Sequence, residues 1–335
     1  MRQLQFLEPG RVEWADVEEP RLAGPGEAIV RPLAVAACDL DVGVVRGLVP
    51  LPGPFALGHE GVVEVVDVGD DVTSVEPGDR AVLAFQVSCG TCDRCRRGVT
   101  GSCRTAGPGA AYGLGPLGRS EPYGGLMADR VRVPYADVML LPLPPDLDAA
   151  DVASLSDNIP DAWRAVGPHP GSGPMLVLGA ASIGLYCAGI AVALGRSVDY
   201  VDTDTDRLAR AERLRATVIE GPPPRKLGPY ELTVTTGVST DDLHCALRST
   251  EPEGTCVDTG IHFGSSAPMP LLEMYTRGIR YVTGRVNAVA AMPAALALVA
   301  DGRLHPKLVT AHTATFDDAP DAWLDMTGKL VLTPE

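Results

Sequence analysis

The pattern of hydrophobic and polar positions changes in character about halfway along the chain. Before residue 145, short apolar runs such as 28–35 and 62–69 are separated by turns rich in Gly and Pro, which is typical of a β-rich domain. After residue 174, short buried strands alternate with helical segments. This alternation favours a parallel sheet with crossover helices, so we predict an α/β protein.

The same pattern places the individual elements. We expect strands at residues 4–7, 28–35, 62–69, 81–85, 129–133, 138–144, 175–178, 197–202, 232–235, 255–259, 280–283 and 329–333. We expect helices at residues 151–156, 185–194, 206–216, 239–249 and 292–301. The last strand follows the last helix, so we interpret it as a return to the β-rich part.

A nucleotide-binding pattern opens the second half. Strand 175–178 runs into the hexapeptide 179–184, whose sequence is Gly-Ala-Ala-Ser-Ile-Gly, and a second strand ends at Asp202, 23 residues after Gly179. In such units the turn and the helix N-terminus bind pyrophosphate, and the acid binds a ribose. Ala181 stands where the motif has its second Gly, and its methyl group costs some closeness to phosphate. Because Asp202 would repel a 2′-phosphate, NAD(H) is favoured over NADP(H).

Composition excludes several classes of partner. The 335 residues suit two domains, and 45% apolar and 21% charged residues describe an ordinary globular protein. The net charge of -15 argues against a nucleic acid or an anionic membrane, because phosphate groups select Lys and Arg. No apolar run reaches the roughly 18 residues of a membrane helix. Residues 1–6 lack the apolar core of a signal peptide, so we expect a cytoplasmic protein.

Four of the eight cysteines lie within fifteen residues, at Cys89, Cys92, Cys95 and Cys103. In a reducing compartment such a cluster favours metal binding over disulfides, and four thiolates suit a tetrahedral structural zinc. An iron–sulfur site is the alternative, and nothing else in the sequence calls for electron transfer. We expect the cysteines in apolar or mixed segments to be buried as small hydrophobic residues: Cys187, Cys245 and Cys256.

Several short motifs together carry a family resemblance. Cys38, Gly58-His59-Glu60, the turn 77–80, the four-cysteine segment and the late nucleotide-binding unit resemble the zinc-dependent medium-chain alcohol dehydrogenases, in the family's order and over essentially the whole chain. The resemblance implies a GroES-like catalytic domain at 1–156 and 287–335, with a structural zinc lobe at 88–104, interrupted by a Rossmann domain at 157–286. Residues 156–160, with Asp157 in place of a third-ligand Cys or Glu, resemble the formaldehyde dehydrogenase branch.

The resemblance also implies roles for individual residues. Cys38, His59 and Asp157 would hold a catalytic zinc, with Glu60 beside it as an exchangeable ligand and Asp41 orienting His59. The four clustered cysteines would hold a second zinc, which makes two per chain. The implied cofactor contacts are Gly179, Ala181, Ser182, Ile183 and Gly184 at the phosphates, Asp202 at the adenosine ribose and Arg207 beside the adenine.

The sequence departs from the family at the proton relay. Family members usually carry Ser or Thr two residues after the first Cys, where it contacts the substrate oxygen, but this chain has Leu40. Some carry a His five residues after that Cys, where this chain has Gly43. Asp161 replaces a common Thr, and Val63 replaces a common Gly. The metal-binding set is therefore complete and the proton-transfer set is not, which leaves water, Glu60 or Asp161 as the carrier.

Taken alone, each proposed ligand has an ordinary structural interpretation. Cys38 is a core cysteine, His59 a structural histidine and Asp157 a helix cap. Only their joint order favours a catalytic zinc. The other histidines lack the spacing of ligands, and we interpret them as loop or surface residues: His169, His244, His262, His305 and His312.

Three functions remain possible on the sequence alone. The first is a zinc-dependent oxidoreductase that transfers hydride between a nicotinamide cofactor and an alcohol or carbonyl, with zinc as Lewis acid. The second is a reductase of an iminium or conjugated carbonyl, which the residues at 40 and 43 favour. The third is a non-catalytic NAD-binding protein. We expect a small-molecule substrate, and a homodimer or homotetramer as in related proteins.

Overall fold

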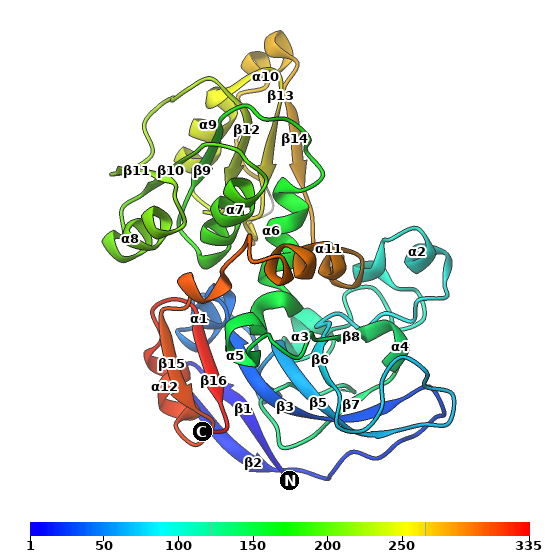
Figure 1. Cartoon of the computed structure of the whole chain (residues 1–335). Helices are drawn as coiled ribbons and strands as arrows, with labels where there is room; N and C mark the ends of the chain where they lie inside the picture. Colours follow the sequence, from blue (N-terminus) through cyan, green and yellow to red (C-terminus); the bar gives the residue numbers. More distant parts are fainter. Residues whose placement is uncertain (121, 265) are drawn as a thin grey trace. The chain divides into compact units, whose positions relative to one another are not determined.

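The computed structural model describes residues 1–120, 122–264 and 266–335, and the chain forms two compact units (Figure 1). Unit 1 comprises residues 1–160, 286–300 and 310–335, and unit 2 comprises residues 161–285 and 301–309. The sequence-based boundaries assigned residues 301–309 to the first domain instead. These residues belong with unit 2 because Leu304 fills the space beside Gly189, where a Cβ would come within 3.0 Å of it, and Arg303 donates to the carbonyl of Ala193.

Unit 1 is built on two sheets. A seven-stranded sheet has the order β15-β16-β3-β5-β6-β8, with β7 paired to β3, and a three-stranded sheet has the order β2-β1-β4. The bounds are β1 (Arg2–Glu8), β2 (Arg11–Asp16), β3 (Ala28–Ala37), β4 (Phe55–Ala56), β5 (Glu60–Val68), β6 (Arg80–Leu83), β7 (Val131–Val133), β8 (Leu140–Pro142), β15 (His312–Thr315) and β16 (Leu330–Thr333). All pairs are antiparallel except β15 with β16.

Apart from α11, the helices of unit 1 are short. They are α1 (Asp39–Val45), α2 (Asp93–Arg96), η1 (Thr100–Ser102), α3 (Gly115–Gly118), α4 (Ala136–Met139), α5 (Ala149–Val152), η2 (Ala153–Ser156), α11 (Ala288–Ala300) and α12 (Ala319–Asp325). The helix expected at 151–156 is α5 followed by η2, and the start of the strand expected at 138–144 is the end of α4. Residues 330–333 do return to unit 1, as the sequence predicted.

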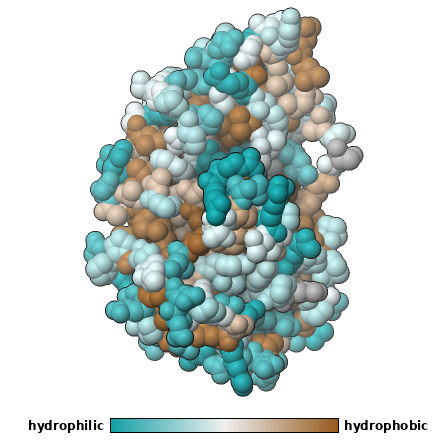
Figure 2. All heavy atoms as spheres, turned by 90° about the vertical axis from the view of Figure 1, so that its right-hand side faces the viewer, coloured by the Kyte–Doolittle hydropathy of each residue, from teal (hydrophilic) through white to brown (hydrophobic). Residues whose placement is uncertain are grey.

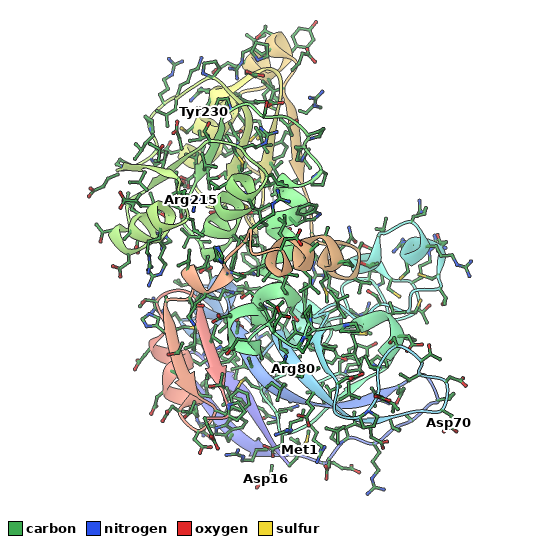
Figure 3. The ribbon with its side chains drawn as sticks, viewed as in Figure 1. Met1, Asp16, Asp70, Arg80, Arg215 and Tyr230 are labelled. Atoms are coloured by element: carbon green, nitrogen blue, oxygen red, sulfur yellow. The ribbon has the colours of Figure 1, made fainter. Side chains whose placement is uncertain are left out.

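Strand β3 fixes the position of the residues around it. Ala36 pairs with Glu60 of β5, and Ala37 pairs with Leu330 of β16. The end of β3 therefore lies between the start of β5 and the start of β16. Arg80, labelled in Figure 3, is the first residue of β6. Its side chain donates to the carbonyls of Pro144 and Pro145, which ties the turn before β6 to the segment after β8.

Unit 2 is a parallel six-stranded sheet with the order β11-β10-β9-β12-β13-β14. Its strands are β9 (Met175–Leu178), β10 (Val198–Asp202), β11 (Thr217–Glu220), β12 (Tyr230–Thr235), β13 (Thr250–Asp258) and β14 (Arg280–Thr283). Its helices are α6 (Asn158–Val166), which begins in unit 1, α7 (Ser182–Ala193), α8 (Thr205–Arg213), α9 (Thr240–Ser249), α10 (Leu271–Arg277) and η3 (Pro306–Leu308). When these six strands are numbered 1 to 6 along the chain, their order across the sheet is 3-2-1-4-5-6, which is the arrangement of the dinucleotide-binding fold.

Helix packing follows from strand alternation in unit 2. Leu176 and Leu178 of β9 point to one face, where they form a core with Leu243 and Leu247 of α9. Helices α7 and α8 connect the strands β9, β10 and β11, as Figure 1 shows. The predicted α/β class, with a β-rich unit and a parallel doubly wound sheet, is confirmed. Within the described ranges, no helix is long and apolar enough to cross a bilayer.

A glycine before β5 provides a test of this framework. Gly58 has φ +89°, and a Cβ there would lie 2.6 Å from the backbone nitrogen of Met127. Gly78 has φ +98°, and a Cβ there would have no atom of the described residues within 4 Å. We expect Gly58→Ala to destabilise the protein by roughly 2–4 kcal/mol, from backbone strain plus overpacking, and Gly78→Ala by about 1–2 kcal/mol from strain alone.

Urea unfolding of both variants measures the difference. Equal losses of stability in the two variants would mean that the close approach of residues 58 and 127 does not constrain the fold.

Candidate metal and cofactor sites

Cys38 lies at the end of β3 and is the N-cap residue of α1. Its backbone N–H donates to Oδ2 of Asp41 at 2.8 Å, which closes the first turn of the helix. The side chain is buried, and burial raises the pKa of the Cys38 thiol to about 11. A thiolate at this position therefore needs a cation close to the sulfur atom.

His59 is next to Cys38 because β3 and β5 are paired. The positive φ of Gly58 turns the chain into β5, and His59 Nε2 lies 3.4 Å from Cys38 Sγ. On the other side of the ring, Nδ1 lies 3.7 Å from Asp41 Oδ1, beyond hydrogen-bond distance, and it has no hydrogen-bond partner in the described part of the chain. Asp41 therefore acts on His59 through charge here.

Asp157 reaches the same point from the end of η2. The hydroxyl of Ser156 donates to the carbonyl of Leu83 in β6 and lies 3.4 Å from the carbonyl of Gly61 in β5, which fixes the chain on the sheet. The next side chain, Asp157, has its Oδ2 3.5 Å from His59 Nε2. Asn158 Nδ2 donates to that same oxygen at 3.1 Å.

The ligand atoms of these three residues fit a zinc ion. Zinc bonds of about 2.3 Å to sulfur and 2.0–2.2 Å to nitrogen or oxygen place tetrahedral ligand atoms roughly 3.3–3.6 Å apart. The separations of Cys38 Sγ and Asp157 Oδ2 from His59 Nε2 are 3.4 and 3.5 Å. Together with a carboxylate oxygen of Glu60, all these atoms lie within 4.8 Å of one another. The structure thus brings together Cys38, His59 and Asp157, the three ligands predicted from the sequence.

Glu60 is part of a buried ion pair that the sequence analysis missed. Lys329 Nζ lies 2.9 and 3.0 Å from the two carboxylate oxygens of Glu60 and donates to Asn158 Oδ1 at 2.8 Å. Both charged side chains are fully buried. Burial raises the pKa of Glu60, and the ammonium of Lys329 opposes this shift. The sequence feature that could have indicated this ion pair is Lys329, a single cationic residue directly before the apolar run 330–332.

The structure explains the departures at the proton relay. Leu40 is partly buried and packs against the apolar core of unit 1. A Cβ at Gly43 would come within 3.0 Å of Val49 Cγ2, so a larger side chain there would displace Val49. In unit 2, Asp161 Oδ1 accepts from Arg164 Nε at 2.5 Å. Positions 40 and 43 therefore offer no group that accepts a proton.

The four clustered cysteines form a second site in unit 1. The sulfur atoms of Cys89, Cys92, Cys95 and Cys103 lie within 4.8 Å of one another. Backbone N–H groups donate to these sulfur atoms, from Cys92 to Cys89 and from Ala106 to Cys103, each at 3.4 Å. Burial raises the pKa of Cys89, but hydrogen bonds from Thr105, Thr91 and the backbone outweigh it and lower the pKa to about 5. Four converging sulfurs with such donors suit a tetrahedral metal.

The loop between β9 and α7 forms the strand–turn–helix unit that the sequence predicted. Residue Ala180 has φ +125°, and Ala181 is the N-cap residue of α7, which starts at Ser182 and continues through Ile183. A Cβ at Gly179 would lie 2.2 Å from Asp202 Oδ2, so only glycine allows β9 and β10 to end this closely together. Gly184 faces Thr236, and a Cβ at Gly184 would lie 3.2 Å from Oγ1 of that threonine.

Asp202 is more fully hydrogen-bonded than the sequence suggested. Arg207 donates to both of its oxygens, at 2.7 and 2.9 Å, the backbone N–H of Asp204 donates at 2.9 Å, and the hydroxyl of Tyr200 donates at 3.2 Å. A carboxylate has about four lone-pair positions, and these bonds use them. Burial raises the pKa of Asp202, but Arg207 and the other donors lower it overall. A ribose hydroxyl at this carboxylate would therefore compete with Arg207.

Comparison with known proteins places these sites in a family context. The alcohol dehydrogenase GroES-like domain matches residues 24–144. The chain is 35% identical over 230 residues to a glutathione-independent formaldehyde dehydrogenase of Pseudomonas aeruginosa, which covers 63% of this chain but only 56% of that protein. It is 29% identical to a probable zinc-binding alcohol dehydrogenase of Mycobacterium tuberculosis, over 95% of this chain and 83% of the relative.

A solved structure agrees over the whole length. An alcohol dehydrogenase from Thermus sp. ATN1 superposes with a TM-score of 0.91 at 29% identity and covers 99% of each chain. The strand order of unit 2, the zinc-type ligand groups of unit 1 and these similarities all agree. The chain is therefore similar over almost its whole length to zinc-type alcohol dehydrogenases.

Proposed function

We propose that this protein is a zinc-dependent oxidoreductase that transfers hydride between a nicotinamide cofactor and an alcohol or carbonyl substrate. The observation that carries the proposal is the buried set of Cys38, His59 and Asp157, whose sulfur and carboxylate atoms lie 3.4 and 3.5 Å from the same imidazole nitrogen. Unit 2, with its dinucleotide-binding strand order, supports the cofactor part of the proposal.

The protein groups would hold and surround the metal. A zinc ion bound to Cys38, His59 and Asp157 would supply Lewis-acid chemistry to a substrate oxygen. Asp157 is held by the amide of Asn158, and Lys329 balances the charge of Glu60 beside the ligands. Because Lys329 occupies both oxygens of Glu60, this carboxylate is restrained from entering the ligand set. The four-cysteine site would hold a second, structural zinc.

A second candidate activity rests on Leu40 and Gly43. A conjugated carbonyl or iminium substrate does not demand proton transfer at the alcohol oxygen, and positions 40 and 43 offer no group for that transfer. Turnover of simple alcohols favours the first activity, whereas reduction of enones or cyclic imines alone favours the second. A panel of both substrate types with NADH oxidation as readout separates them.

We also propose a cytoplasmic location. All eight cysteines are free thiols in the structure, and the cluster at 89–103 keeps its metal-binding form only where thiols stay reduced.

Metal analysis tests the catalytic site directly. We expect two zinc ions per chain in protein purified without added metal, and one in Cys38→Ser, because this substitution removes the thiolate ligand. Turnover should fall by at least about a hundredfold, since the metal contributes several kcal/mol to catalysis. Cys245→Ala, in α9 of unit 2, is the control and should keep both metals. One zinc per chain in the wild type as well as in Cys38→Ser would disprove the proposed chemistry.

We propose NAD(H) as the preferred cofactor. A 2′-phosphate at the end of β10 would lie against the buried carboxylate of Asp202, and Arg207 offsets only one charge. Asp202→Ala would remove this repulsion and release Arg207 to bind the phosphate. We expect the ratio of the NADPH to the NADH dissociation constant to fall by about tenfold, measured by fluorescence titration.

Asp206→Ala removes an exposed acid on α8 and serves as the control for net charge. If both variants leave the ratio unchanged, Asp202 does not select the cofactor.

We further propose a homodimer or homotetramer assembled through unit 2. In the described chain β14 pairs only with β13, so its other edge has unpaired backbone groups. The neighbouring α10 exposes Leu271, Leu272 and Tyr275, which are 67%, 76% and 85% exposed, and Figure 2 shows apolar surface at the level of α10. An open strand edge beside apolar side chains can pair with a second copy about a two-fold axis.

Leu272→Glu should weaken this assembly, because it places a charge in the apolar surface. We expect a lower mass by light scattering at micromolar concentration, with an affinity loss of roughly tenfold or more. Leu48→Glu in unit 1, where Leu48 is 75% exposed, is the matched control. An unchanged mass for Leu272→Glu would locate the interface elsewhere.

A further inference from the structure

A hydrogen-bonded cluster lies at the carboxyl end of β13. Asp258, the last residue of that strand, is fully buried and accepts from His262 Nε2 at 2.8 Å and from the hydroxyl of Tyr281 in β14 at 2.8 Å. The backbone N–H of Gly260 donates to its other oxygen at 2.8 Å. The sequence alone predicts only a loop or surface position for His262 and gives no link between His262 and Asp258.

The hydrogen bond to Asp258 determines which tautomer the neutral imidazole of His262 adopts. Since an ionised carboxylate only accepts hydrogen bonds, the hydrogen of neutral His262 is on Nε2, and Nδ1 carries the lone pair. Burial and the bond to Asp258 raise the pKa of Tyr281, so its phenol stays protonated and donates. A buried carboxylate that orients a partly exposed imidazole is the arrangement of a general base. The side chain of His262 is 27% exposed, so the ring remains accessible.

The position of the cluster within unit 2 points to the cofactor. Asp258 pairs with Thr235, which pairs with Leu178, the residue directly before Gly179. The cluster thus lies at the carboxyl ends of the strands, as does the turn between β9 and α7. Dinucleotide-binding folds consist of two halves, one for each mononucleotide. Asp202 ends β10 in the adenosine half, so β12, β13 and β14 form the half that receives the nicotinamide mononucleotide.

Oxidation of an alcohol requires a base near that half. The C–H bond breaks with its electron pair, which reduces the nicotinamide, and the O–H proton must go to a separate acceptor. Leu40 and Gly43 cannot accept it, and the Asp161 carboxylate is bonded to Arg164. Because hydride transfer requires the substrate carbon against the nicotinamide ring, a base on the nicotinamide half of unit 2 serves the reacting end of the cofactor.

We propose that His262 is the proton acceptor of the oxidation, with Asp258 as the residue that positions it. Nδ1 takes the alcohol proton as the hydride leaves, and the imidazolium then releases the proton to water. In the reduction of a carbonyl, Nδ1–H returns the proton to the oxygen while the cofactor supplies the hydride. This inference rests on the proposed function and adds the group that the sequence lacks at positions 40 and 43.

Substitution of His262 by Gln tests the role. We expect kcat for alcohol oxidation to fall by about a hundredfold or more, because general-base catalysis contributes 10²–10⁴-fold. The ionisation in the neutral range of the wild-type pH–rate profile should disappear. NADH affinity and two zinc ions per chain should persist, which shows that the variant is folded. His244→Gln, at a partly buried histidine of unit 2 that contacts the Pro268 carbonyl, should behave as wild type.

Two further measurements separate catalysis from a structural role. Imidazole added to His262→Gly should restore turnover, with a rate that depends on the basicity of the added imidazole. Nitrogen NMR of the wild-type protein without substrate should show the Nε2–H tautomer of His262, and Asp258→Asn should change it. A structural clamp would show neither rescue nor a change in the pH profile.

The outcomes distinguish this inference from the proposed function. Wild-type turnover together with an unchanged pH profile in His262→Gln, or the absence of imidazole rescue, overturns the role of His262 alone. A wild type that binds NADH but converts no alcohol or carbonyl overturns the proposed function, and the role of His262 with it.

Discussion

The pairing of β3 with its two neighbours is the constraint on which the candidate metal site depends. Cys38 follows the last residue of β3, His59 precedes the first residue of β5, and Lys329 precedes the first residue of β16. A shift of one residue in either pairing would turn the side chains of that strand to the other face of the sheet. The backbone hydrogen bonds of the sheet thus determine the separations of the ligand atoms, which a flexible loop would not hold.

Charge balance is the second constraint on unit 1. The carboxylates of Asp41 and Glu60 are buried near Cys38, and Lys329 forms an ion pair with Glu60. Burial of uncompensated charge is costly, so a thiolate and a further carboxylate at this position require another cation. The candidate ligand atoms are spaced for a divalent metal ion, and such an ion would supply the positive charge needed beside Cys38 and Asp157.

What the sequence predicted depends on how local each feature is. The cysteine spacing at 89–103 and the strand–turn–helix at 175–184 are encoded within a few residues, and the fold class followed from the alternation of short strands and helices along the chain. Lys329 was missed because its partner Glu60 is 269 residues away in the chain. His262 was missed because the burial of Asp258 and the contact with Tyr281 arise only when β13 and β14 pair. The saturation of Asp202 by Arg207 is a matter of side-chain geometry, which spacing alone does not reveal.

The interrupted path of unit 1 has a consequence for the order of folding. Residues 161–285 form most of unit 2 as one continuous segment, whereas unit 1 needs residues from both sides of that segment. Contacts between distant residues carry a larger loop-closure cost, and an inserted unit that folds first shortens the effective loop. During synthesis, Cys38, His59 and Asp157 are therefore present long before the lysine that neutralises their neighbour. Until β16 is synthesised and pairs with β3, the three candidate ligands lie beside a Glu60 carboxylate that has no lysine partner.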